Sequence, residues 1–300
     1  MTDATTTSDL ALDDPSMDGD LARPAWELYP HRGVMHDVWV IARRGLIHMK
    51  RQPEQLSDAT IQPIMFVVMF AYVFGGAIAV PGSDDGSAQA YREFLMGGIM
   101  AQTLVFAAFG VALSIANDRK NQAVDRFRAL PIAGGAVLGG HAVANIIKAL
   151  LPITLMSITG YIVGWRIRGS LVETLSAYAM MVAFAFAMIW IGVLLGSLAS
   201  TPEGVNGIAF VALFPLTFVA STFVPLASMP APLQTIASWN PITTLADALR
   251  MQFGNPNTPI QPGDPWSVAH PIAYTWIWIF AIVIICAPAS VRTYRRSIEK

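Results

Sequence analysis

The stretch VETLSAYAMMVAFAFAMIWIGVLLGSLA, residues 172–199, holds one charged side chain, Glu173, close to its start. A helix needs about 20 mostly apolar residues to cross a hydrocarbon layer about 30 Å thick, and this stretch meets that requirement. Hydrophobic residues make up 54% of the chain and charged residues 13%, against about 25% charged residues in soluble domains. Five further stretches have a similar character: 59–80, 94–116, 142–164, 205–225 and 270–290. The sequence therefore predicts an all-α integral membrane protein whose residues 53–300 form six transmembrane helices.

The distribution of basic residues indicates how these spans are oriented. An even number of spans places both termini on one side, and loops rich in lysine and arginine stay in the cytoplasm. With both termini inside, fourteen basic residues fall in inner segments and four in outer ones. We therefore expect a multi-pass protein of the plasma membrane with both termini in the cytoplasm. The outer basic residues are Arg92, Arg166, Arg168 and Arg250, and the pair in GWRIRGS (164–170) runs against the rule.

Two segments precede the first span. Residues 1–32 are rich in aspartate and lack an apolar core, which predicts a disordered acidic tail on the cytoplasmic side. Residues 33–52 place apolar side chains at helical spacing, with Arg43, Arg44 and Lys50 mostly on the other side. This pattern predicts an N-terminal interfacial amphipathic helix that contacts membrane lipids. An ordinary packed surface helix is the alternative.

The segment 226–269, between the fifth and sixth spans, is long and half apolar. Prolines separate two short helical patterns within MPAPLQTIASWNPITTLADALRMQ, residues 229–252. This predicts short outer helices, either interfacial or forming a shallow re-entrant pair, whose non-helical backbone must be buried in protein or face water. The segment is a candidate outer lid, and a simple folded extracellular loop fits equally well.

Several chemistries find no support in the chain. No lysine follows a glycine, as a P-loop requires, so ATP hydrolysis by that route is not expected here. Histidines and carboxylates do not cluster along the sequence, so we expect no metal site and no catalytic residues. No carboxylate lies near the middle of a span, which disfavours an ion-coupled carrier. Lys148 in the third span either snorkels to the interface or is a functional charge. The net charge of −1 disfavours a nucleic-acid partner.

Two further patterns suggest sites. The polar stretch ANDRKNQAVDRFRALPIAG, residues 116–134, follows the second span and would lie in the cytoplasm, where a soluble partner could act on it. A solvated charged face is the alternative. Aromatic and sulfur-containing side chains at helical spacing either line a path for a flat amphiphilic molecule or simply pack against lipid and other helices. They are Phe66, Met69 and Tyr72 in the first span, and Phe210, Phe214 and Phe218 in the fifth. The GxxxG pairs Gly160/Gly164 and Gly192/Gly196 allow close helix contacts, although this motif is common in apolar helices.

Six stretches carry a family resemblance, in the family's order along the chain. They are FVVMFAYVFGGAIA (66–79), FLMGGIM (94–100), VDRFRALPI (124–132), TPEGVNG (201–207), LFPLTFVASTFVP (213–225) and MPAPLQTIASWNPITTLADALR (229–250). On these motifs the chain resembles the membrane component of ABC transporters of the type-2 family, the daunorubicin-resistance permeases. DRFRALP and FPLTFVASTFV are the most specific of them.

The resemblance implies a half-transporter. Two six-span subunits, identical or paralogous, would pair around a path, and two copies of a cytoplasmic P-loop ATPase would supply the energy. ATP and magnesium would bind to that partner, so no cofactor is expected on this chain.

The resemblance also implies that a cytoplasmic coupling helix after the second span contacts the ATPase. The residues carried over to that contact are Asp118, Asp125, Arg126, Phe127, Arg128, Leu130 and Pro131. Thr201 and Glu203, in the turn before the fifth span, form a second candidate contact. The implied cargo is an anthracycline-like drug or another amphiphilic natural product, with a lipid or cell-envelope lipid as the alternative. An ion-coupled secondary transporter is the rival class.

Overall fold

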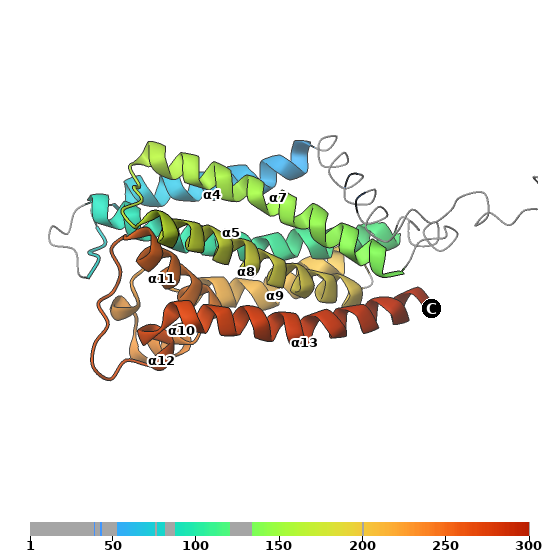
Figure 1. Cartoon of the computed structure of the whole chain (residues 1–300). Helices are drawn as coiled ribbons and strands as arrows, with labels where there is room; N and C mark the ends of the chain where they lie inside the picture. Colours follow the sequence, from blue (N-terminus) through green and yellow to red (C-terminus); the bar gives the residue numbers. More distant parts are fainter. Residues whose placement is uncertain are drawn as a thin grey trace, which may run out of the picture.

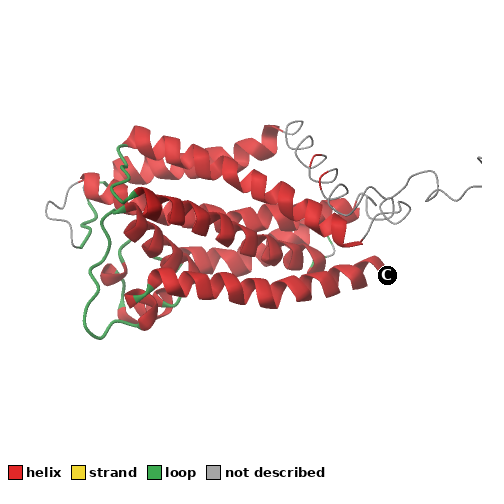
Figure 2. Ribbon diagram, in the orientation of Figure 1, coloured by secondary structure: helices red, strands yellow, loops and turns green. Residues whose placement is uncertain are grey.

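The computed structural model describes residues 39, 43, 53–75, 77–81, 88–120, 134–199 and 201–299, and these fold into helices without a strand among them (Figure 2). For 53–60, 118–119, 134–145 and 294–299 the backbone alone is described. The acidic tail, most of the expected interfacial helix and the loop 121–133 lie outside the described residues.

Six long helices run side by side, and consecutive ones point in opposite directions (Figure 1). They are α4 (Pro53–Val73), α5 (Ala88–Lys120), α7 (Gly134–Val163), α8 (Leu171–Leu198), α9 (Pro202–Phe218) and α13 (Pro271–Glu299). Short helices gather at one end, here called the α11 end: η1 (Leu226–Ser228), α10 (Ala231–Ser238), α11 (Pro241–Phe253) and α12 (Trp266–Ala269). The opposite end, where α5 and α13 finish, is called the Lys120 end.

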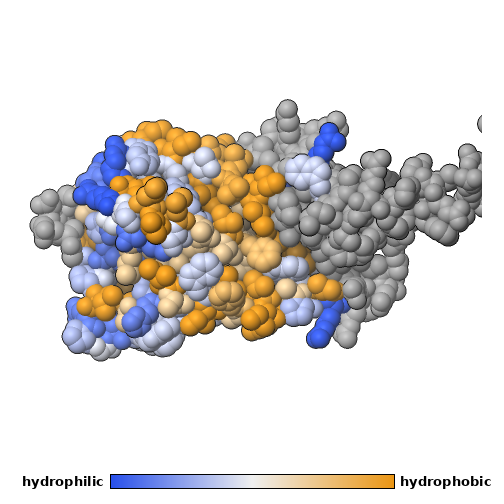
Figure 3. Space-filling model, viewed as in Figure 1, coloured by the Kyte–Doolittle hydropathy of each residue, from blue (hydrophilic) through white to orange (hydrophobic). Residues whose placement is uncertain are grey.

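Four of the long helices are long and apolar enough to cross a membrane. The qualifying stretches are Ala88–Asn117, Ile146–Val163, Leu171–Leu198 and Pro271–Thr293, whereas the apolar parts of α4 (Ile61–Val73) and α9 (Pro202–Phe218) are shorter. Hydrophobic side chains gather over the middle of the bundle, and hydrophilic ones at the α11 end (Figure 3). The prediction of an all-helical, multi-pass membrane protein is confirmed, while the count of six spans stays a prediction.

Two of the expected spans end earlier in the structure. The helix expected over 59–80 ends at Val73, because the chain turns at Phe74, whose carbonyl accepts a hydrogen bond from the Ala77 amide at 3.0 Å. The helix expected over 205–225 ends at Phe218, three residues after Pro215. The residues after Phe218 find their hydrogen-bond partners on α11 instead of continuing the helix.

The core lies where α5 packs against α8, the most extensive helix contact among the described residues. A Cβ on Gly192 would lie 2.5 Å from the Ala108 carbonyl oxygen, and one on Gly196 would lie 2.6 Å from that of Ala112. The close contact that this GxxxG pair allows is therefore present. A Cβ on Gly160 would lie 2.7 Å from the Met96 side chain and one on Gly164 would lie 3.2 Å from the Gln89 side chain, both on α5, although Gly164 lies just beyond the end of α7 and turns the chain with a φ of +112°.

Candidate functional site

At the Lys120 end, one ion pair joins the two segments expected to meet an ATPase. Lys120, the last residue of α5, lies 3.6 Å from Glu203 in the first turn of α9, and both side chains are exposed. α9 starts here because the Thr201 hydroxyl accepts a hydrogen bond from the Gly204 amide at 3.1 Å and Pro202 occupies the first turn. The end of α5 and the start of α9, two helices that also pack against each other, are therefore adjacent at this end.

Most of the residues expected in the coupling helix stay predictions. Asp125, Arg126, Phe127, Arg128, Leu130 and Pro131 lie outside the described residues. Asp118 belongs to the last turn of α5, where only its backbone is described. Thr201 caps α9 and Glu203 pairs with Lys120, so these two are placed at the end of the bundle from which the 121–133 loop leaves.

The two aromatic rows proposed as a substrate path lie on helices that both pack against α5. On α9, the rings of Phe210, Phe214 and Phe218 stack in series, with centroids 4.8 and 4.1 Å apart, and all three are exposed. On α4, Met69 and Tyr72 are exposed, whereas Phe66 packs partly buried against Phe70 and Phe223. The row on α9 is therefore continuous, and the row on α4 is divided between surface and core.

At the α11 end, Arg250 is the centre of a cluster that the sequence did not reveal. Its side chain is fully buried (0% exposed). The guanidinium donates to the Phe94 carbonyl at 2.8 Å, to the Ser221 carbonyl at 2.7 Å and to the Asp247 carboxylate at 2.7 Å. It also lies over the Phe94 ring, 3.5 Å from its centroid. We call this set of contacts the Arg250 clamp, because it holds α5, the turn after α9 and α11 together.

Other side chains of α11 support the same turn. The Asn240 amide donates to the carbonyls of Leu216 and Val219, both at 2.7 Å, while its oxygen caps the α11 N-terminus. The Thr243 hydroxyl accepts from the Ser221 amide at 3.0 Å. Backbone groups that leave a helix within an apolar bundle need such partners, since no water can satisfy them. This is the physical reason why α9 can end at Phe218.

Two neighbouring glycines on α5 make the clamp possible. A Cβ on Gly97 would lie 2.9 Å from the Arg250 side chain and 3.1 Å from the Ala246 carbonyl oxygen. A Cβ on Gly98 would overlap the Thr222 carbonyl oxygen. The FLMGGIM motif is therefore the surface of α5 on which α11 and the turn 221–222 rest.

Burial also shifts the titration of the clamp. Desolvation raises the pKa of the Asp247 carboxyl, and the charge and hydrogen bond of Arg250 oppose that shift. The opposite charges of Asp247 and Arg250 neutralise each other in a buried site. Removing either one alone would leave an unpaired buried charge, which lowers the stability of the fold.

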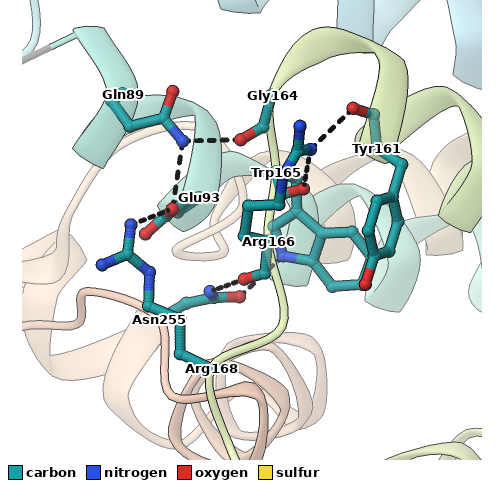
Figure 4. A network of polar contacts seen from close by, with 8 residues as sticks. All are labelled: Gln89, Glu93, Tyr161, Gly164, Trp165, Arg166, Arg168 and Asn255. Atoms are coloured by element: carbon teal, nitrogen blue, oxygen red, sulfur yellow. Dashed lines mark hydrogen bonds and ion pairs between the residues drawn. The ribbon is translucent and has the colours of Figure 1, made fainter.

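The basic residues that run against the positive-inside rule have local partners (Figure 4). Arg168 pairs with the buried carboxylate of Glu93 at 2.7 Å. Arg166 donates to the carbonyls of Tyr161 and Trp165 at 2.7 and 2.8 Å, next to the C-terminus of α7. A cation at a helix C-terminus is stabilised by the exposed carbonyl groups there. Both charges therefore have partners within the α11 end, and they say little about which end of the bundle faces the cytoplasm.

The same network anchors the segment that follows α11. The Trp165 indole donates to the Asn255 side-chain oxygen at 2.7 Å, and the Asn255 amide donates to the Arg166 carbonyl at 2.8 Å (Figure 4). Gln89 donates to both Glu93 and the Gly164 carbonyl. Trp165 is completely buried. The α7–α8 turn, α5 and the end of α11 thus form one connected layer.

Across the described ranges, no group of three or more His, Cys, Asp or Glu side chains is placed to hold a metal ion.

The long apolar helices define this chain as a multi-pass integral membrane protein. Its sequence matches the profile of the ABC-2 type transporter family over residues 36–253. The chain belongs to the ABC-2 type transporter family. This range includes α5, the loop 121–133, the start of α9 and all of α11.

Named relatives point in the same direction. The chain is 29% identical to a daunorubicin resistance ABC transporter permease protein of Streptomyces coeruleorubidus, over 84% of this chain and 83% of that protein. It is 24% identical to a probable doxorubicin resistance ABC transporter permease protein of Mycobacterium tuberculosis, over 80% of this chain and 81% of the other. A putative transport permease of Cyanophora paradoxa is 22% identical over 74% of this chain and 75% of its own length.

Proposed function

We propose that this chain is the membrane subunit of an ATP-driven exporter and that a separate cytoplasmic ATPase drives it. The observation that supports this most strongly is the family match over residues 36–253. Relatives that align along most of the chain are named as ABC transporter permeases. A second permease, identical or paralogous, completes the transporter, and two ATPase copies bind at the Lys120 end, which faces the cytoplasm.

Force from the ATPase enters through the loop 121–133 and reaches two helices at once. The loop continues directly from α5, and Lys120 at the end of α5 pairs with Glu203 at the start of α9. A displacement of the loop therefore moves α5 and α9 together. Because α9 carries the exposed stack of Phe210, Phe214 and Phe218, the same movement repositions a surface suited to flat apolar molecules.

The proposed cargo is an amphiphilic drug or natural product with a flat ring system. Two relatives are named for daunorubicin and doxorubicin resistance. In this chain the exposed phenyl rings of α9 offer stacking surfaces for such a molecule. Transport of a lipid is the alternative cargo, and a transport panel that contains both anthracyclines and fluorescent phospholipids separates the two.

The coupling assignment is tested by charge reversal with a matched control. The variant R126E/R128E is compared with R295E/R296E, which makes the same change of charge in the basic C-terminal segment. Each is purified together with the partner ATPase and reconstituted in liposomes. We expect R126E/R128E to lose ATPase binding and export, and R295E/R296E to keep both. Equal behaviour of the two variants would refute the assignment.

A further inference from the structure

Helix α10 presents an apolar face that none of the described residues covers. Leu233, Ile236 and Trp239 are 43, 61 and 47% exposed, and their spacing of three places them on one side of the helix. Ala237 and Ser238, at the C-terminal end of the helix, are buried. No charged residue occurs between Glu203 and Asp247, so α9 after its first turn, α10 and the start of α11 carry no charged side chain.

Aromatic residues from three helices meet at the C-terminal end of this face. Trp239 packs edge to face against Tyr274, with ring centroids 5.6 Å apart, and Trp266 packs against Tyr274 at 5.9 Å. His270 lies beside Trp266 at 5.3 Å. Trp239 and Trp266 remain about half exposed. Indole and phenol rings with one apolar and one polar edge are enriched where a membrane meets water.

The depth of this cluster follows from α13. Pro271 begins both α13 and its membrane-spanning stretch, and Tyr274 lies three residues further on. At 1.5 Å per residue, Tyr274 is about 5 Å along the helix from that start. An interfacial helix lies about 5–10 Å into the boundary between headgroups and acyl chains. Trp239, which contacts Tyr274, therefore lies close to the start of this candidate span.

We propose that α10 lies in the plane of the membrane interface at the α11 end and binds the phospholipid surface there. Leu233 and Ile236 enter the acyl region, while Trp239 and Trp266 lie among the headgroups. The neighbouring helix α11 does the opposite: its side chains are almost all buried against α5, α8 and α13. Of the two short helices, one is thus a lipid anchor and the other a part of the protein core.

Two observations favour lipid over water or a second protein copy. The loop after α11 has the polar character of a water-facing segment. It contains Gln261 and Asp264, and the Gln261 backbone amide donates to the Asp264 carboxylate at 2.7 Å. Helix α10 carries no charged side chain, and the hydroxyls of Thr235 and Ser238 donate within the helix to the carbonyls of Ala231 and Thr235. Through the contact of Trp239 with Tyr274 it also adjoins α13, a helix long and apolar enough to cross a membrane that exposes Ile277 and Phe280.

The test uses nitroxide labels on single cysteines in the full chain, in which Cys286→Ala has removed the native thiol. The variants L233C and I236C are reconstituted in phosphatidylcholine–phosphatidylglycerol vesicles and compared with Q261C and I284C. Gln261 marks the aqueous loop, and Ile284 is 69% exposed on α13 and marks the acyl region. The readout is the ratio of label accessibility to oxygen and to a water-soluble nickel chelate.

We expect L233C and I236C to give ratios between the two references and closer to I284C. A ratio equal to that of Q261C would overturn the proposal in favour of an aqueous loop. Low accessibility to both reagents would overturn it in favour of a protein partner on this face.

A second measurement guards against variants that fold poorly. Tryptophan fluorescence of the otherwise native chain is quenched by phospholipids brominated near the headgroup or near the chain end. We expect W239F/W266F to reduce the quenching by the headgroup-proximal lipid selectively. Unchanged selectivity would contradict the proposal. Neither measurement involves the ATPase, so failure here is distinguishable from failure of the proposed transport function.

Discussion

Replacing Arg250 by methionine is the sharpest test of how the α11 end is held together. Methionine preserves most of the side-chain volume and removes the guanidinium. The change leaves the Asp247 carboxylate buried without its partner, and it deprives the Phe94 and Ser221 carbonyls of their donor. Breaking a buried ion pair on one side costs about 3–5 kcal/mol, and buried acceptors left without a donor cost about 1–3 kcal/mol each.

We therefore expect R250M to lose at least about 3 kcal/mol of unfolding free energy. The double variant R250M/D247L removes both charges and should recover part of that loss, because only the carbonyls then remain unsatisfied. R250K keeps the charge but has no planar fork of donors, so it should fall between R250M and the wild type.

The assay is reversible unfolding in bicelles by titration with a denaturing detergent, followed by tryptophan fluorescence. Arg166→Met serves as the control, since Arg166 is exposed and donates only to carbonyls at the surface; we expect a loss below about 1 kcal/mol there. If R250M unfolds within about 0.5 kcal/mol of the wild type, the clamp does not stabilise this end of the bundle and the reasoning fails.

Three further outcomes follow from the same contacts. Gly98→Ala should destabilise the fold by about 1–3 kcal/mol through overpacking, whereas Gly207→Ala should not, as nothing lies within 4 Å of a Cβ there; thermal unfolding of the two checks this. Asn240→Asp keeps an acceptor for the α11 cap but loses the amide that donates to two carbonyls, so it should destabilise almost as much as Asn240→Ala. K120E should reduce ATP-driven export, and K120E/E203K should restore it; a double variant as inactive as the single one would exclude the ion pair as the reason.

The helices were readable from the sequence because apolar composition alone marks a stretch that can cross a bilayer. Residues 172–199 were predicted as a span, and α8 occupies Leu171–Leu198. The helix ends were less accessible, since they depend on partners far along the chain. α9 stops at Phe218 because Asn240 donates hydrogen bonds to the carbonyls of Leu216 and Val219, and Thr243 accepts one from the Ser221 amide. These partners lie more than 20 residues further along the chain, so the residues around Phe218 do not reveal them.

The candidate site shows the same division. The sequence suggested Thr201 and Glu203 as a second contact with an ATPase; the structure pairs Glu203 with Lys120 at the end of α5, and the contact with an ATPase stays a prediction. Arg250, in contrast, entered only as one of four outer basic residues, since charge counting cannot distinguish a buried arginine from an exposed one. The signals that could have found it were the adjacent Gly97 and Gly98 and the Asp247–Arg250 spacing of one helical turn, which together indicate a close, charged helix contact.

The Arg250 clamp also constrains how the protein is assembled as it is synthesised. The Arg250 side chain bonds to the Phe94 carbonyl across 156 residues of chain. At about 5–20 residues per second, α5 leaves the ribosome roughly 8 to 30 s before Arg250 does. Until Arg250 is synthesised, the surface of α5 at Gly97 and Gly98 lacks its contact with the Arg250 side chain, and the Ser221 carbonyl lacks its hydrogen-bond donor. The α11 end therefore cannot close before Arg250 has been synthesised, and chains that terminate before Arg250 should be recognised as incomplete by membrane quality control.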